Sequence, residues 1–210
     1  MDHRSWANER QTEAPLTLRL LQKPVQAAVP DSRVVTRAKL GDLDAFTEIV
    51  QAYYGRCLRF ARAMLRNPDE AEDMVQETFV RLYRALPRYE ERQRFESWLF
   101  QILGNCCRTA NTVQRRESQR TVDDEGAIAR LASSDDASRV AESQWSDTVR
   151  NALAELPEYN REIFLLHYIE GFSYDEIERM TGVRQSALKM RVKRASDALR
   201  ARLASWVARQ

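Results

Sequence analysis

The sequence predicts an all-α protein made of two helical domains joined by a flexible linker. Glycine and proline are scarce, at six residues each, and the runs of Val, Ile and Thr that are typical of strands are absent. Apolar residues recur at three- and four-residue spacings in two long stretches, which indicates amphipathic helices. Between Phe100 and Trp145 there is no aromatic residue, so the segment joining the two stretches cannot form a core of its own.

Residues 1–32 are predicted to be a poorly ordered N-terminal extension, because they mix polar residues with three prolines around one short apolar piece, LTLRLL. The longest apolar run of the chain is IFLLHYI at residues 163–169, which is far too short to cross a bilayer. The N-terminus also lacks the apolar centre of a secretory signal. We therefore expect a cytoplasmic protein without membrane insertion.

The first helical domain is predicted over residues 33–114. Asp42 is placed to cap a helix that begins after it. Asn67 and Pro68 start a second helix, with acidic residues in its first turn and Val75, Phe79 and Leu82 on its buried side. A third helix begins with an aromatic residue in FESWLFQILGN, from residue 95. Residues 115–139 are then assigned to the acidic, polar linker.

The second domain is predicted over residues 140–210 and contains a helix-turn-helix. Ser173 and Glu176 have the spacing of a capping box at the start of a short helix. Gly182 allows a tight turn, and a longer helix begins near Arg184. A short supporting helix, a glycine turn and a longer helix are the order found in helix-turn-helix motifs.

A helical wheel separates the last helix into an apolar and a basic side. One narrow face is apolar and contains Leu188, Val192, Ala195 and Leu199. Cations lie on the flank and further round, at Lys189, Lys193, Arg194 and Arg200, and Arg191 is expected to lean outward from the core boundary. Since the net charge is only +2, affinity for nucleic acid must come from such local placement of charge. The alternative is an ordinary helix with a solvated basic face.

Residues suited to catalysis or metal binding are not grouped in this sequence. We find no nucleophile beside a base, no phosphate-binding loop, and only two isolated histidines, His3 and His167. Cys57, Cys106 and Cys107 have no disulfide or zinc-finger spacing, and the adjacent pair is interpreted as small helix residues. We therefore expect no enzyme activity, no cofactor and no metal.

Both halves together resemble the extracytoplasmic-function (ECF) group of bacterial sigma-70 factors. The strings NPDEAEDMVQETFVRLYRAL and FESWLFQILGN are similar to sigma region 2, a helical bundle, and the sequence from LPEYNREIF to DALRARL is similar to region 4. The resemblance implies a sigma factor that binds core RNA polymerase, recognises the −35 and −10 promoter elements and promotes strand opening at transcription initiation. An anti-sigma factor is a common partner in this group.

The resemblance also implies roles for residues of the region 2-like domain. By this resemblance, core polymerase binds a polar stripe formed by Asp73, Gln76, Glu77 and Arg81. Without the resemblance, the same stripe would be interpreted as an ordinary solvated helix face. Capture of the melted −10 strand falls on a loop and the helix that follows it, at Tyr89, Arg92, Gln93, Arg94, Trp98, Asn105 and Arg108. The spacing of Trp98 also suits a core residue. After Asn105 the chain lacks the strongly basic continuation of the family, which puts a contact with upstream duplex in question.

For the −35 element, the resemblance implies contacts from the start and the basic side of the last helix. The matching positions on the basic side are Lys189, Met190, Arg191, Lys193 and Arg194. At the start of the helix, Arg184, Gln185 and Ser186 replace the proline- and glycine-containing residues that are frequent in the family, and they are included in the predicted contact. The linker acids, at Asp123, Asp124, Glu125, Asp135 and Asp136, are hypothesised to occupy a nucleic-acid path of the polymerase until nascent RNA displaces them.

Two other functions fit parts of the pattern. A helix-turn-helix repressor or activator would bind palindromic duplex as a dimer without polymerase. A helical adaptor would use the basic face to bind an acidic protein. A sigma factor instead requires polymerase for specific promoter binding.

Overall fold

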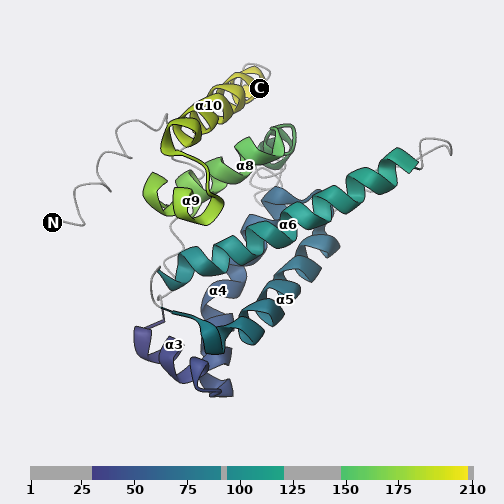
Figure 1. Ribbon diagram of the computed structural model, residues 1–210. Coiled ribbons are helices and arrows are strands. Elements are labelled where there is room, and N and C mark those ends of the chain that lie inside the picture. The colour runs from purple at the N-terminus through teal and green to yellow at the C-terminus, as the bar shows by residue number, and fades with distance from the viewer. Residues whose placement is uncertain (1–29, 91–93, 121–147, 208–210) are drawn as a thin grey trace.

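The computed structural model describes residues 30–90, 94–120 and 148–207, with side chains to residues 116 and 204 in the last two ranges. Within these ranges the regular structure is helical, as the sequence predicted (Figure 1). The first domain holds α3 (Ser32–Lys39), α4 (Leu43–Met64), α5 (Pro68–Ala85), the 3-10 turn η1 (Leu86–Arg88) and α6 (Phe95–Arg120). The second holds a helical segment at residues 148–154, α8 (Glu158–Phe164), the π-helix η2 (Leu165–Ile169), α9 (Tyr174–Thr181) and α10 (Gln185–Val207).

Helix starts in the first domain follow the capping signals of the sequence. The Asp42 carboxylate accepts a hydrogen bond from the Ala45 amide at 3.0 Å, and Asn67 caps α5 through the Asp69 amide. The expected stripe of α5 is buried, and α4, α5 and α6 pack around a shared core whose fully buried members include Ile49, Phe60, Leu82, Leu99 and Leu103. These predictions are confirmed.

The last helix of the first domain is longer than the sequence indicated. α6 continues to Arg120, beyond the expected boundary at residue 114, so the first part of the predicted linker is helical. The linker acids and the start of the predicted second domain, residues 121–147, lie outside the described residues, as does the N-terminal extension up to residue 29. The proposed role of the linker acids stays a prediction.

The helix-turn-helix is formed as predicted. The Ser173 hydroxyl accepts from the Glu176 amide while the Glu176 carboxylate accepts from the Ser173 amide, which completes the capping box. Gly182 ends α9 in the left-handed region at φ 70°. The apolar side of α10 is buried as expected, at Leu188, Val192, Ala195 and Leu199. The π-helix that follows α8 was not predicted.

The two domains pack directly against each other: α9 packs on α6, α8 packs on α4, and α10 is outermost (Figure 1). The rings of Phe100 and Phe172 meet edge to face at 5.4 Å across this interface. The sequence predicted two domains joined by a linker, but it did not predict that the domains pack against each other. Periodicity within a helix reports that a face is buried but not which element buries it.

Other expected properties can be compared only within the described residues. There, none of the helices is both long and apolar enough to traverse a lipid bilayer. Cys57, Cys106 and Cys107 are free, buried thiols, and burial raises the pKa of Cys57 to about 12. The adjacent cysteines therefore lie in the core as helix residues.

Two glycine-to-alanine substitutions are predicted to change stability in opposite directions. Gly182→Ala places a Cβ on a residue with positive φ, which should destabilise the fold by about 1 kcal/mol. Gly55→Ala lies inside α4 with only ordinary contact to the Arg59 side chain, and should stabilise it by about 0.5 to 1 kcal/mol. Urea unfolding of both variants is the measurement. Equal shifts would contradict the conformational explanation.

Candidate nucleic-acid and polymerase interface

The second domain presents a basic surface on α10, the outermost helix of the closed arrangement (Figure 1). Four of the predicted −35 residues have exposed side chains there: Lys189, Met190, Lys193 and Arg194. The Lys189 ammonium also lies 5.8 Å from the Tyr174 ring of α9. We call these four residues the α10 surface. Exposed cations on one side of a helix can contact nucleic-acid phosphates.

The start of α10 contributes unequally to this surface. Arg184 and Ser186 are exposed, whereas Gln185 is half-buried and its amide donates to the Asp175 carboxylate of α9. This bond ties the first turn of α10 to the supporting helix. Gln185 is therefore part of the hinge between the two helices as well as a predicted contact residue.

Arg191 does not lean out into solvent as its position on the wheel suggested. Its side chain is half-buried, its Nη1 is buried without a hydrogen-bond partner, and its guanidinium lies 5.5 Å from the Tyr159 ring. It lines a small cavity together with Asn105 and Glu162. The expectation of an outward guanidinium is corrected because α8 supplies both a ring, Tyr159, and a carboxylate, Glu162, on that side.

The predicted polymerase stripe lies on the solvent side of α5. Asp73, Gln76 and Arg81 are exposed, and Glu77 is half-buried with an ion pair of 2.7 Å to Arg81. Sequence analysis missed two large apolar residues on the same side, Val80 at 42% and Tyr83 at 43% exposure. Their spacing of four and seven residues from Gln76 was a usable signal. Exposed apolar side chains beside polar ones are typical of a protein-binding surface.

The aromatic residues of the predicted −10 region form a cluster at the start of α6. Tyr89 is buried and its ring stacks on Trp98 at 4.6 Å, while Phe95 meets both rings edge to face. Trp98 is half-buried, so it packs on the core and keeps part of its indole exposed. Arg92 and Gln93 lie outside the described residues. Arg94 is exposed and lies 3.5 Å from the Glu176 carboxylate.

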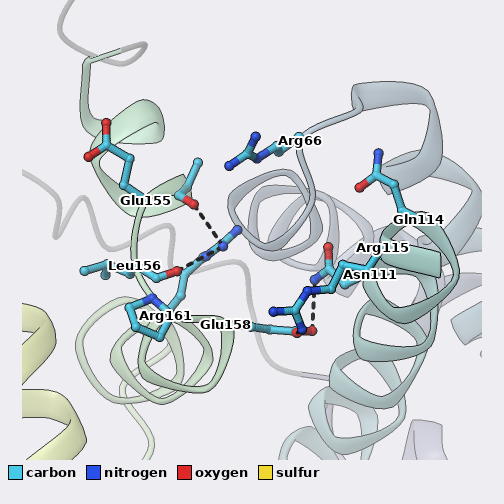
Figure 2. Close-up of a pocket in the computed structure, with 10 residues that line it drawn as sticks. Arg66, Asn111, Gln114, Arg115, Glu155, Leu156, Glu158 and Arg161 are labelled. Atoms are coloured by element: carbon cyan, nitrogen blue, oxygen red, sulfur yellow. Dashed lines mark hydrogen bonds and ion pairs between the residues drawn. The ribbon is translucent and has the colours of Figure 1, made fainter. Parts of the chain in front are cut away.

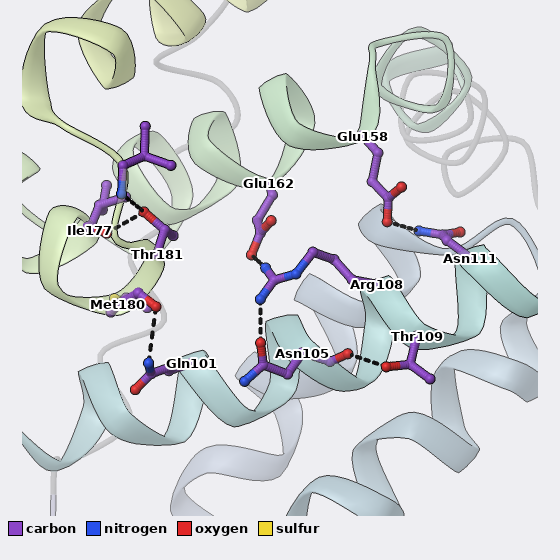
Figure 3. Close-up of polar contacts among 11 residues, drawn as sticks. Gln101, Asn105, Arg108, Thr109, Asn111, Glu158, Glu162, Ile177, Met180 and Thr181 are labelled. Atoms are coloured by element: carbon purple, nitrogen blue, oxygen red, sulfur yellow. Dashed lines mark hydrogen bonds and ion pairs between the residues drawn. The ribbon is translucent and has the colours of Figure 1, made fainter.

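Further along α6, Arg108 connects the two domains (Figure 3). Its guanidinium donates to the Glu162 carboxylate of α8 through Nη1 and to the Asn105 side chain through Nη2. Asn105 remains exposed, whereas the side chain of Glu162 is only 3% exposed. Burial is the main cause that raises the pKa of Glu162, and Arg108 opposes it.

Gly104 makes room for this contact. A Cβ at this position would lie 2.7 Å from Oε1 of Glu162, so a side chain here would displace the carboxylate. The Glu162 carboxylate thus rests against the bare backbone of α6, one residue before Asn105.

A second buried carboxylate joins the domains near the start of α6. Glu170 follows the π-helix and accepts from Nε of Arg56 at 3.1 Å, while Nη1 of Arg56 donates to Glu96 at 2.7 Å. The Glu170 side chain is 3% exposed, and burial raises its pKa against the effect of Arg56.

Two uncharged donors of α6 also bond across the interface. The Gln101 amide donates to the Met180 carbonyl at 3.0 Å, and the Asn111 amide donates to Glu158 at 3.0 Å (Figure 3). Sequence analysis missed Glu162, Glu170 and Gln101 as interface residues, since charged or polar residues within a helical pattern do not indicate their partners. The second domain therefore contacts two residues that were predicted to face the promoter, Arg94 and Arg108, while Asn105 stays exposed. We call this the closed arrangement.

Two family models match the chain, one in each domain. Residues 49–117 match sigma-70 region 2, and residues 146–199 match sigma-70 region 4. RNA polymerase sigma factor CarQ of Myxococcus xanthus is 32% identical over 164 residues, which cover 78% of this chain and 92% of that protein. The chain belongs to the ECF group of the sigma-70 family. ECF RNA polymerase sigma factor SigW of Bacillus subtilis (strain 168) is 29% identical, over 80% of this chain and 94% of its own length.

Solved structures share the fold of this ECF factor. One is CnrH in complex with the cytosolic domain of CnrY, with a TM-score of 0.60 and 24% identity over 82% of this chain and 96% of that chain. Another is the sigma factor RpoE in complex with the anti-sigma factor NepR from Bartonella quintana, with a TM-score of 0.61 and 24% identity over 76% and 96%. The curated relatives are named sigma factors, which favours that function over a repressor or an adaptor.

The closed arrangement is predicted to open when the charge of Glu162 is reversed. Glu162→Lys faces Arg108 with a like charge and should shift the closed-to-open ratio by about thirtyfold or more, because breaking a buried pair costs about 2 kcal/mol or more. Energy transfer between dyes on cysteines placed at the exposed positions Arg84 and Asp197 measures the opening, since the native thiols are buried.

The charge-exchanged variant, Arg108→Glu with Glu162→Lys, should close again. Glu72→Lys provides the matched control, because Glu72 pairs with Arg62 at 2.7 Å within the first domain, lines neither cavity between the domains, and should leave energy transfer unchanged. Equal transfer in Glu162→Lys and the native chain would show that this pair does not hold the domains together.

Proposed function

We propose that this ECF sigma factor is the promoter-specificity subunit of RNA polymerase for a set of genes. Region 2 binds core polymerase and the opened −10 strand, and region 4 binds the −35 duplex. The observation that supports this proposal best is the pair of exposed surfaces on two matched sigma regions: the polar stripe of α5 and the α10 surface. The factor has no catalytic step of its own in this role and works with polymerase in the cytoplasm.

The α10 surface is proposed to read the −35 element in the major groove. Lys189, Lys193 and Arg194 offer cations for phosphates or for guanine edges, and Met190 offers apolar contact to a thymine methyl group. Arg184 lies one residue before the first turn of α10, where backbone amides also favour a phosphate.

Region 2 is proposed to bind the −10 strand through α6 and the loop before it. The exposed part of Trp98 gives an unstacked base an aromatic surface beside Tyr89, and Arg94 lies nearby for the backbone. Asn105 and Arg108 offer hydrogen-bond donors further along the same helix. In the closed arrangement Arg94 and Arg108 already contact carboxylates of the second domain, so promoter binding requires the domains to separate.

Core polymerase is proposed to bind the α5 stripe together with Val80 and Tyr83. The polar residues Asp73, Gln76, Glu77 and Arg81 supply directed contacts, and the two apolar side chains supply buried area. The stripe lies on α5 and the interface with the second domain lies on α6 and α4, so polymerase has access to it in the closed arrangement.

Replacing two cations of the α10 surface should weaken promoter binding. We expect Lys189→Ala with Arg194→Ala to reduce the affinity of the reconstituted holoenzyme for its −35 duplex by at least about tenfold, since each contact contributes about 1 to 3 kcal/mol. The salt dependence of binding should become less steep. Fluorescence anisotropy at several salt concentrations measures both. Core binding is the control and should not change.

Replacing two residues of the α5 stripe should weaken assembly with polymerase. We expect Gln76→Ala with Glu77→Ala to lower the affinity for core enzyme by about tenfold, as for residues at the centre of an interface. The unfolding midpoint should stay nearly unchanged, because the side chains of Glu77 and Arg81 are 40% and 48% exposed, and ion pairs at the surface contribute little to stability. Native core affinity in this variant would place the polymerase surface elsewhere on region 2.

A further inference from the structure

A cavity of about 650 Å³ lies where the two regions meet, beside the turn between α4 and α5 (Figure 2). Arg66 lines it from that turn, Gln114 and Arg115 line it from α6, and Arg161 lines it from α8. The segment that leads into α8 completes the wall. Three arginines of both regions therefore face one space, which we call the arginine pocket.

Arg161 supplies a buried positive charge to this wall. Its residue exposure is 7%, and its guanidinium donates to three backbone carbonyls, those of Met64, Ala154 and Leu156, at 2.8, 3.1 and 3.2 Å. Its Nε is buried without a hydrogen-bond partner. Burial lowers the pKa of Arg161, which Glu158 opposes, and the charge of Arg66 lowers it further.

The carboxylates of the pocket do not neutralise Arg66. Glu158 accepts from Asn111 at 3.0 Å and lies 4.0 Å from Arg115, and Glu155 pairs with Arg202, which does not line the pocket. Among the residues that the structure describes, Arg66 makes no hydrogen bond or ion pair. Arg66, which is exposed, and Arg161, which is buried, thus line the same pocket without a carboxylate bound to either guanidinium.

We propose that the arginine pocket binds a small phosphate-bearing anion. Arg66 and Arg115 are the contacting cations, and the buried charge of Arg161 adds to the attraction. The planar guanidinium fork suits the oxygens of a phosphate group, and the cavity volume falls within the usual range of about 300 to 1,000 Å³ for small-ligand sites.

The anion would couple to domain closure, because region 2 and region 4 both contribute to the wall. A ligand that binds only when the pocket is assembled stabilises the closed arrangement by its binding free energy. This site is separate from the α10 surface and the α5 stripe. Its test therefore needs neither promoter nor polymerase.

Calorimetric titration of the full chain with inorganic pyrophosphate, at constant ionic strength set by chloride, tests the site. We expect saturable binding, which Arg66→Gln should weaken by about tenfold through the loss of one charge-assisted contact. Arg116→Gln is the matched control: it removes one exposed arginine of α6 that does not line the pocket, and should leave the affinity unchanged.

Energy transfer between the α5 and α10 labels supplies a second readout. Pyrophosphate should raise the closed fraction of the native chain, and this increase should be lost in Arg66→Gln with Arg115→Gln. The proposal is overturned by a lack of saturable binding or by equal weakening in Arg116→Gln. Binding of a single-stranded oligonucleotide but not of pyrophosphate would also overturn it, because the pocket would then belong to a nucleic-acid path.

Discussion

The polar side chains of α6 that face the second domain need hydrogen-bond partners, and in the closed arrangement the second domain supplies these partners. Arg108 contacts Glu162, Gln101 donates to the Met180 carbonyl, and Asn111 donates to Glu158. A charge or donor removed from water without a partner costs several kcal/mol, so region 4 can pack here only because it brings matching acceptors. The same donors would otherwise be free for phosphates and bases.

This interface is specific without being strongly stabilising. A buried ion pair gains little over its desolvation, so the contacts of Glu162 and Glu170 fix the register of the two domains more than they add free energy. The edge-to-face contact of Phe100 with Phe172 adds about 0.5 to 1.5 kcal/mol beyond its buried area. A polymerase that offers new contacts to region 2 and region 4 can therefore compete with closure.

The features that the sequence predicted well, the helix caps and the glycine turn, depend on interactions between residues close together in the chain. The capping oxygen of Asp42, the box of Ser173 with Glu176, and the positive φ of Gly182 depend on neighbours within a few residues. The packing of the second domain on the first depends on residues far apart in the chain, such as Arg56 and Glu170, and no local pattern pairs them. The extra length of α6 was missed because polar residues continue a helix without an apolar stripe to mark it.

For the candidate site, the sequence predicted which side chains are exposed but not the direction in which each side chain at the edge of the buried face points. The wheel placed Lys189 and Arg194 in solvent correctly, since the buried face of α10 fixes the opposite side. Arg191 lies at the edge of that face, so its direction is decided by Tyr159 and Glu162 of another helix. Glu162 thus attracts one cation from each proposed DNA surface, Arg108 through a direct bond and Arg191 across a shared cavity. Separation of the domains would break the bond of Arg108, whereas Arg191 and Glu162 both belong to the second domain and would stay together. Domain separation therefore makes the −10 surface available without changing the contacts of Arg191 within its own domain.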